Sequence, residues 1–187
     1  MNHNSIIVVT GNKDKFDEIA KTLAEFKIAA KQVNMSIEEK GSTLEEIVVD
    51  KAKKAFEQVK QPLIVDDTGV YFNAYDDFPG PFPKRVFEKF GLAGLLKKLE
   101  GKDRGAAFKT VICYIDEKGY KLFYGALEGT ITEKIHDAGE RASLQYERIF
   151  IPFGYKITVS AMSIEDKIKI SHRAHATRKF VAWFKKL

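Results

Sequence analysis

The chain has 187 residues, of which 44% are hydrophobic and 30% are charged, and its formal net charge is +5. This length suits one ordinary domain with a buried core, and the composition excludes disordered and fibrous proteins. The positive charge favours anionic partners such as nucleotides or nucleic acid, although a chain with 31 basic and 26 acidic residues can also simply be rich in ion pairs.

Cysteine content and hydropathy indicate the cellular location in which the protein is expected. Cys113 is the single cysteine, so an intrachain disulfide and a thiolate metal cluster are both excluded. It lies in the apolar run 110–115, where we expect a buried, unreactive thiol. Residues 1–5 are polar, the apolar run after them is too short for a signal peptide, and no segment reaches membrane-spanning length. We therefore expect a cytoplasmic protein with no membrane partner.

The first part of the chain alternates strands and helices. Gly11-Asn12 ends a β-branched run, and the Thr-x-x-Glu sequence that begins at Thr43 is a capping box. We expect the third strand to deliver Asp66-Asp67-Thr68-Gly69 at its carboxyl end. The expected elements are strands over 6–10, 28–33 and 62–65, a helix from residue 13, and a helix over 43–59.

The pattern changes to antiparallel structure in the second part of the chain. The expected elements are a loop at 79–81, short helices around 84–90 and 92–99, a long hairpin of 107–116 and 120–131, a short strand over 149–151, and a helix from about residue 175 to the end. We predict one α/β domain with a mixed, elongated sheet and flanking helices. A lobe made of 1–75 and 150–187 and an antiparallel lobe of about 76–149 would enclose a central cleft, a usual ligand site.

The motif Thr10-Gly11-Asn12-x-x-Lys15 joins a strand end to a helix start. Such a turn exposes backbone N–H groups at the positive end of a helix dipole, which suits phosphate, and Lys15 adds a charge one turn later. The same residues also fit an ordinary helix capped by Asn12, because the longer glycine-rich spacing of a Walker loop is missing.

Acidic residues supply the second set of candidates. Asp66 and Asp67 are costly at the end of a buried strand unless a cation neutralises them, and alternation along a strand predicts that only one of them enters the cleft. That carboxylate can hold Mg²⁺ or take a proton from a water molecule. Glu39 is a second metal-ligand candidate, although the segment Glu38-Glu39-Lys40 and the later Lys51 also fit a solvated charged surface.

A basic segment lies near the carboxyl end. Lys167 and Arg173 can hold phosphate or a base edge, and His172 can hydrogen-bond to a purine carbonyl. Ser171 and His172 do not form a nucleophilic pair, since no Gly-x-Ser-x-Gly elbow accompanies them. The plainer interpretation is a helix capped by Ser171 and followed by surface basic residues.

These motifs in this order, across almost the whole chain, resemble the inosine triphosphate pyrophosphatase (Ham1-like) family. The matching segments are Thr10 to Lys15, Asp66 to Gly69, Pro79-Gly80-Pro81-Phe82-Pro83-Lys84, and Asp166-Lys167 through Ser171-His172-Arg173. The resemblance implies an ITPase-like fold. It also implies a homodimeric enzyme that cleaves ITP, XTP or dITP between the α and β phosphates, releasing the monophosphate and pyrophosphate and so clearing non-standard purines from the nucleotide pool.

The resemblance also implies roles for individual residues. Asp67, Lys15 and Lys51 would be catalytic, and Glu39 with Asp67 would hold Mg²⁺, for which Mn²⁺ can substitute. The implied substrate-binding residues are Thr10, Gly11, Asn12, Lys13, Lys15, Thr68, Lys84, Leu144, Tyr146, Glu147, Lys167, His172 and Arg173.

One segment departs from the family pattern. Where the family has Phe-Gly-Tyr/Trp-Asp-Pro, this chain has Leu144-Gln145-Tyr146-Glu147-Arg148, so an aromatic ring and a close-packing glycine are both replaced. We therefore expect a shifted or weakened base preference. The alternatives are a pyrophosphatase for another modified nucleotide, or a nucleotide- or nucleic-acid-binding relative without hydrolysis. The acidic residues Glu39 and Asp67 argue against the latter, because a protein that only binds phosphate gains nothing from buried carboxylates.

Overall fold

The computed structural model describes residues 4–38, 40–137 and 144–187. Its strands are β1 (Ser5–Val9), β2 (Ala29–Val33), β3 (Leu63–Phe72), β4 (Pro79–Gly80), β5 (Gly105–Asp116), β6 (Gly119–Ile131) and β7 (Phe150–Pro152). Its helices are α1 (Lys13–Ala24), α2 (Leu44–Val59), α3 (Pro83–Lys98), α4 (Ile164–Ile170) and α5 (His172–Phe184), with short 3-10 helices η1 (Gln145–Ile149) and η2 (Val159–Ala161).

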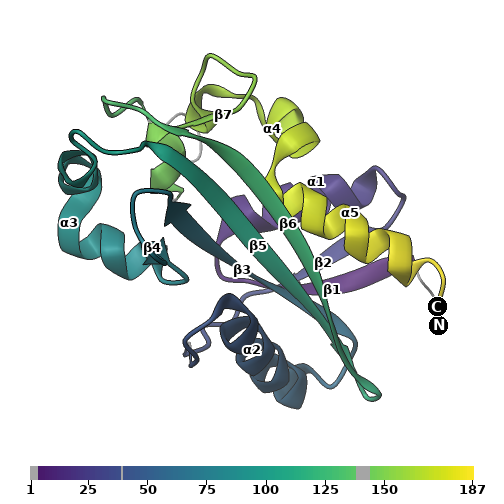
Figure 1. Cartoon of the computed structure of the whole chain (residues 1–187). Coiled ribbons are helices and arrows are strands. Elements are labelled where there is room, and N and C mark those ends of the chain that lie inside the picture. Colours follow the sequence, from purple (N-terminus) through teal and green to yellow (C-terminus); the bar gives the residue numbers. More distant parts are fainter. Residues whose placement is uncertain (1–3, 39, 138–143) are drawn as a thin grey trace.

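The strands form one mixed sheet in the order β2-β1-β3-β5-β6-β7, and β4 pairs with β3 (Figure 1). β1 is parallel to both β2 and β3, whereas the remaining pairings are antiparallel. The long β5–β6 hairpin runs from Gly105 to Ile131, as predicted. The expected mixed α/β sheet with flanking helices is therefore confirmed, whereas the division into two lobes stays a prediction.

Helices cover both faces of the sheet (Figure 1). α1 and α5 lie on one face, where Phe180 and Ile19 join the core beneath β1, β3 and β5. α2 lies on the other face, where Val48 and Ala52 pack against Val65 and the buried Cys113. Burial raises the pKa of the Cys113 thiol to about 12, which agrees with the expected unreactive cysteine. In the part of the chain that the structure describes, no helix has both the length and the apolar character needed to cross a membrane.

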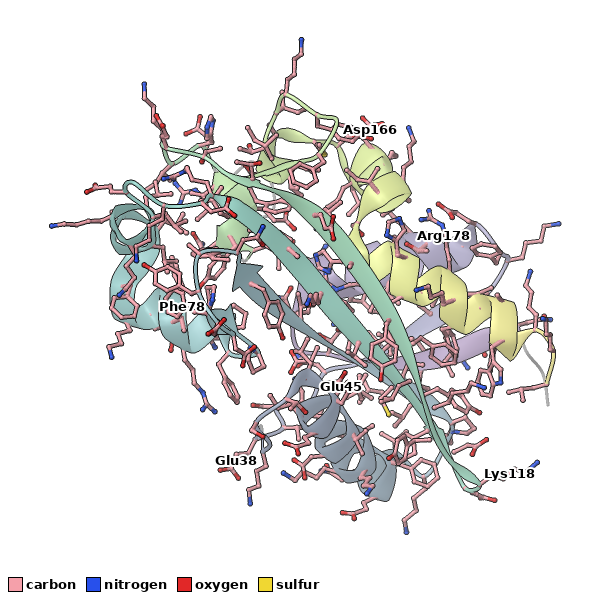
Figure 2. All side chains as sticks on the ribbon, in the orientation of Figure 1. Glu38, Glu45, Phe78, Lys118, Asp166 and Arg178 are labelled. Carbon is pink, nitrogen blue, oxygen red and sulfur yellow. The ribbon has the colours of Figure 1, made fainter. Side chains whose placement is uncertain are left out.

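A third core cluster occupies the end of the sheet near α3. Phe78, labelled in Figure 2, packs edge-on against Phe72 of β3 and Phe90 of α3. α3 is broken at Gly91, whose φ of 60° and ψ of 175° are not helical, so it consists of the two short helices predicted from the sequence. This break lets Leu92 and Leu95 turn into the core.

Local signals explain most helix starts. The Asn12 side chain accepts a hydrogen bond from the backbone N–H of Lys15 and caps α1, and Thr43 and Glu46 form the predicted capping box of α2. Ser171 caps α5 through the backbone N–H of Ala174.

Three predicted element assignments were wrong, and one helix was not predicted. β3 does not end before Asp66 but continues to Phe72, because β5 pairs with it along its whole length. α5 begins at His172 rather than near His175, since Ser171 caps it. Pro79–Gly80 pairs with β3 instead of forming only a loop, and α4 was not predicted.

The start of α5 lies directly on β6 because Gly125 has no side chain. A Cβ atom at Gly125 would lie 1.9 Å from the His172 carbonyl oxygen and 2.6 Å from the Ala176 backbone nitrogen. The close approach therefore places the first turn of α5, with His172 and Arg173, against the sheet.

We predict that Gly125→Ala lowers the free energy of unfolding by about 1–3 kcal/mol, because backbone atoms of α5 must move. An unconstrained glycine-to-alanine change would instead stabilise by about 0.4–1 kcal/mol. Urea denaturation measures the difference, with Glu128→Ala at an exposed position of the same strand as the control. A Gly125→Ala protein as stable as wild type would contradict the tight packing.

Candidate active site

A cleft of about 850 Å³ lies beside the carboxyl end of β1 and the middle of β3. The turn after β1, the loop after β2 and the first turns of α3 and α5 form its walls, together with η1. Its size is within the usual range for small-molecule sites, and ligands of open α/β sheets commonly bind at the carboxyl ends of parallel strands.

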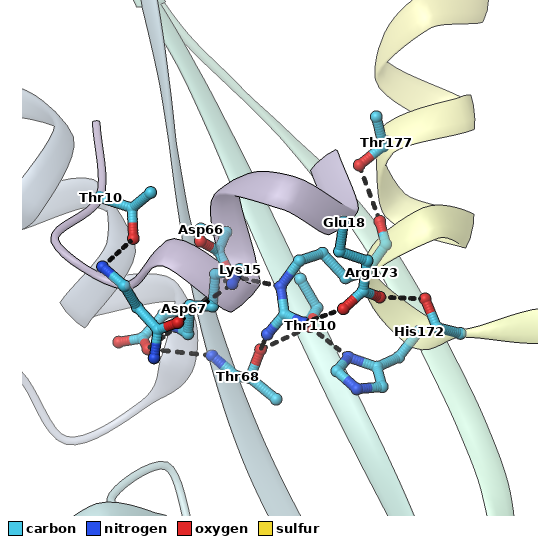
Figure 3. Close-up of polar contacts among 12 residues, drawn as sticks. Thr10, Lys15, Glu18, Asp66, Asp67, Thr68, Thr110, His172, Arg173 and Thr177 are labelled. Atoms are coloured by element: carbon cyan, nitrogen blue, oxygen red, sulfur yellow. Dashed lines mark hydrogen bonds and ion pairs between the residues drawn. The ribbon is translucent and has the colours of Figure 1, made fainter. Parts of the chain in front are cut away.

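The turn at one end of the cleft is held in shape by its own polar groups. The Thr10 hydroxyl accepts a hydrogen bond from the backbone N–H of Asn12 at 3.2 Å, and the Asn12 side chain accepts one from Lys15 at 3.1 Å (Figure 3). Thr10, Gly11, Asn12 and Lys15 all line the cleft. The amino end of α1 and a lysine ammonium therefore face the same space, which suits an anion.

Two carboxylates and two ammonium groups meet in the cleft next to this turn. Lys15 Nζ lies 3.4 Å from Asp66 Oδ2 and 3.8 Å from Asp67 Oδ1. Lys51 Nζ, from α2, lies 3.6 Å from Asp67 Oδ2. Both aspartates border the cleft, but the Asp66 side chain is bound to the buried Arg173 whereas Asp67 lies between the two lysines, so the expectation that only one carboxylate enters the cleft stays a prediction. Lys15 and Lys51 keep part of their side chains accessible, so they can also approach a bound anion.

Behind the cleft lies a buried charged network, which we define as Glu18, Asp66, Lys167 and Arg173. Arg173 donates from Nε to Asp66 at 2.9 Å and from Nη1 to Glu18 at 2.7 Å. Lys167 Nζ lies 2.8 Å from Glu18, and the Ser171 hydroxyl also donates to Glu18. The network joins α1, β3, α4 and α5, and Figure 3 shows the part centred on Arg173.

The network shifts the pKa values of its members. Burial alone would raise the pKa of Asp66, but the charges of Lys15 and Arg173 outweigh it and lower the pKa to about 2. Glu18 behaves in the same way: burial opposes ionisation, yet Lys167 and Arg173 hold its pKa well below the usual range. Burial and the Arg173 charge lower the pKa of His172, which is therefore neutral at physiological pH.

The opposite wall of the cleft contains η1 and the start of α3. The Tyr146 hydroxyl donates to the Pro83 carbonyl at 2.8 Å, and its ring packs edge-on against Phe87. Glu147 lies 2.5 Å from Lys167 Nζ, so η1 is tied to the buried network. Leu144 lines the cleft beside them.

The structure brings most of the predicted site residues together. Those that line the cleft are Thr10, Gly11, Asn12, Lys15, Lys51, Asp67, Thr68, Lys84, Leu144, Tyr146, Glu147, His172 and Arg173. Lys13 does not line it; its ammonium pairs with Asp17 on the exposed side of α1. Lys167 is 1% exposed and is enclosed by Glu18 and Glu147. Glu39 lies outside the described residues, whereas the adjacent Glu38 lines the cleft and lies near the amino end of α2 (Figure 2).

Sequence reasoning missed three residues of the site. Glu18 shares a helix face with Lys15, three residues earlier, and that spacing was the available signal. Asp66 was treated only as the neighbour of Asp67, although it binds Arg173. Thr110 is buried in β5 and contacts both Thr68 and His172; a single hydroxyl next to the apolar run 111–115 hinted at a polar partner.

The mixed sheet and the cleft, in which two carboxylates meet two lysine ammonium groups, define an α/β protein with a charged candidate ligand site. The sequence model of the Ham1 family matches residues 6–183. The chain belongs to the Ham1 family.

Relatives match over nearly the whole chain. It is 40% identical to a dITP/XTP pyrophosphatase of Saccharolobus solfataricus over 92% of this chain and 90% of the relative, and 37% identical to one of Methanopyrus kandleri over 96% of both. Among solved structures, a HAM1 protein from Coxiella burnetii superposes with a TM-score of 0.82 at 25% identity, covering 97% of this chain and 100% of the other. The Staphylococcus aureus Ham1 protein has the same fold, with a TM-score of 0.78 at 24% identity over 96% of this chain and 98% of the other.

The first prediction from the site concerns Lys167. Lys167→Met should lower the free energy of unfolding by about 3–5 kcal/mol, because Glu18 and Glu147 lose a buried partner. Lys169→Met, which removes an exposed ammonium from the same helix, should change it by at most about 1 kcal/mol. Urea denaturation of both variants tests this. Equal stabilities, with only the Michaelis constant altered in Lys167→Met, would point instead to a substrate-contacting lysine.

The second prediction concerns pH. Glu18 and Asp66 have lowered pKa values in the folded state, so the unfolded chain binds protons first as the pH falls. Stability should therefore be retained above roughly pH 5 and should decline from there towards pH 2. Glu18→Gln should be less stable at pH 7 but should show a shallower decline between roughly pH 5 and pH 3. Urea denaturation across this range measures the slopes, and identical slopes would contradict the role of Glu18.

Proposed function

We propose that this protein is a Mg²⁺-dependent pyrophosphatase for purine nucleoside triphosphates with non-standard bases, such as dITP, XTP and ITP. The observation that carries the proposal is the position of Asp67. This residue lines the cleft between Lys15 and Lys51, beside the turn Thr10–Asn12 at the amino end of α1. The relatives named dITP/XTP pyrophosphatases, at 35–40% identity over most of the chain, support the same substrate class.

The triphosphate would lie along the basic side of the cleft. The turn at Thr10–Asn12 offers backbone N–H groups, and Lys15 and Lys51 offer positive charge. Phosphoryl chemistry depends mainly on positioning and on neutralising developing charge, so these groups would orient the α and β phosphates and stabilise the departing pyrophosphate.

The carboxylates fit a small, hard cation. Asp66 Oδ1 is buried and accepts no hydrogen bond from the described residues, and Asp67 presents its carboxylate to the same cleft. The described residues contain no group of three or more metal-ligating side chains. Mg²⁺ commonly takes one or two carboxylates and completes its shell with phosphate and water. Asp67 would hold it, together with Glu39 of the acidic loop or the neighbouring Glu38, and the ion would neutralise phosphate charge.

In the reaction, a water oxygen forms a bond to the α phosphorus while the bond from that phosphorus to the α–β bridging oxygen breaks. The products are the nucleoside monophosphate and pyrophosphate. Asp67 would accept the proton from the attacking water, since its carboxylate lies beside the two lysines that would hold the phosphates. The base would lie towards Tyr146 and His172 at the other end of the cleft.

A panel of dITP, XTP, ITP, ATP and GTP tests the proposal. With Mg²⁺ we expect pyrophosphate release from dITP, XTP and ITP, its loss on chelation, and its recovery with Mg²⁺ or Mn²⁺. Asp67→Asn should lower kcat by at least about 10²-fold, whereas Asp116→Asn, at the tip of the β5–β6 hairpin, should retain wild-type rates. A folded wild-type protein that hydrolyses none of the five triphosphates would refute the proposed pyrophosphatase activity.

The homodimer and the cytoplasmic location are inferred only from family resemblance and from the sequence. Sedimentation of the purified protein would decide the oligomeric state.

A further inference from the structure

A line of hydrogen bonds crosses the sheet beneath the cleft and ends on His172. Arg173 Nη2 donates to the Thr68 hydroxyl at 3.0 Å, the Thr68 and Thr110 hydroxyl oxygens are 2.6 Å apart, and Thr110 lies 2.6 Å from His172 Nδ1 (Figure 3). Thr68 and Thr110 face each other directly in the β3–β5 register, so the pairing of the two strands holds the hydroxyls together.

Arg173, at the charged end of this line, determines which group donates and which accepts in each hydrogen bond. A guanidinium only donates hydrogen bonds, so the Thr68 oxygen is an acceptor towards Arg173. The Thr68 proton then has one acceptor among the described residues, the Thr110 oxygen. Thr110, which lies 2.6 Å from His172 Nδ1, would then donate its own proton to that nitrogen. In the reverse direction the Thr68 proton would have no acceptor among the described residues and would point into the cleft, which Thr68 lines, so only the forward direction pairs every hydroxyl proton of the line within the protein.

The direction of these hydrogen bonds determines which nitrogen of the His172 imidazole carries the proton. Burial and the neighbouring Arg173 keep its imidazole neutral, so one nitrogen carries a proton and the other accepts. With Nδ1 accepting from Thr110, the proton belongs on Nε2. Among the described residues none pairs with Nε2, and His172 lines the cleft. The edge of Phe108 packs against the imidazole ring at 5.3 Å between centroids and limits its rotation.

We propose that Thr110 is a positioning residue that fixes the Nε2–H tautomer of His172, and that this N–H selects purines with a carbonyl at C6. The inference rests on the proposed function, since it requires the base to lie at this end of the cleft. Hypoxanthine and xanthine present an acceptor oxygen at C6, whereas adenine presents an amino group there, which would leave two donors facing each other.

The tautomer can be measured without any activity. Long-range ¹H–¹⁵N correlation spectra of the wild-type protein, with His172 assigned by its absence in His172→Gln, should show a protonated Nε2 and an unprotonated Nδ1. In Thr110→Val we expect the preference for Nε2–H to decrease. In Thr110→Ser, which keeps the hydroxyl, we expect the wild-type pattern.

Kinetics test the specificity. Thr110→Val should reduce the ratio of kcat/KM for ITP to kcat/KM for ATP about tenfold, the effect of one hydrogen bond, while Thr110→Ser should largely keep the wild-type ratio. Thr158→Val is the matched control, because it removes an equally buried hydroxyl that pairs with Ser160 away from the cleft. It should leave the ratio unchanged, so a loss of stability alone cannot produce the expected effect.

The outcomes separate the inference from the function on which it rests. If wild type hydrolyses ITP but its spectrum shows a protonated Nδ1, or Thr110→Val keeps the ITP/ATP ratio, then the inference is wrong and the function stands. If wild type hydrolyses none of the triphosphates, the proposed function fails and the selection at C6 fails with it, whatever the tautomer. If Thr110→Val does not fold, the wild-type spectrum and the Thr110→Ser ratio still decide.

Discussion

The contact between Arg173 and its two buried carboxylates, Glu18 and Asp66, is the interaction on which the site depends. A guanidinium that is 1% exposed is tolerated in a protein interior only when its charge and its hydrogen bonds are matched. Glu18 comes from α1, Asp66 from β3 and Arg173 from α5, so the matching can occur only when these three elements are assembled. Lys167 extends the same network to α4 and, through Glu147, to η1.

This network divides the cleft into two chemically different ends. At one end, Lys15 lies near both Asp66 and Asp67, so the turn at Thr10–Asn12 and the two carboxylates interact electrostatically with one another and with Arg173. At the other end, Arg173 reaches Thr68, and the hydroxyl line leads on to His172. Charge is thus concentrated where a polyphosphate would bind, whereas a neutral imidazole faces the place of the base. Gly125 allows this arrangement, because the first turn of α5 approaches β6 more closely than any side chain would permit.

The segment that departs from the family pattern acquires a clear structural role. Glu147 pairs with the buried Lys167, and Tyr146 is anchored to Pro83, so η1 is held on the wall of the cleft even without the aromatic and glycine residues of the pattern. The altered residues Leu144, Gln145 and Glu147 line the cleft. Position 144 therefore offers an aliphatic side chain instead of a stacking ring, whereas the polar groups of the cleft, such as His172, are held in place by the fold.

The sequence by itself determined the features that arise from local chemistry. The caps at Asn12 and Thr43, the long hairpin and the order of the motifs depend on neighbouring residues or on short periodicities, so they could be predicted and were confirmed. Tertiary structure decided the extension of β3 through Asp66 and Asp67, because only pairing with β5 stabilises a strand through two carboxylates. It also decided that Lys167 is enclosed while Lys15 is accessible. Nothing in the local sequence separates these two lysines. The difference arises because Glu18, which is distant from Lys167 in the sequence, becomes its neighbour on folding and, with Glu147, encloses it.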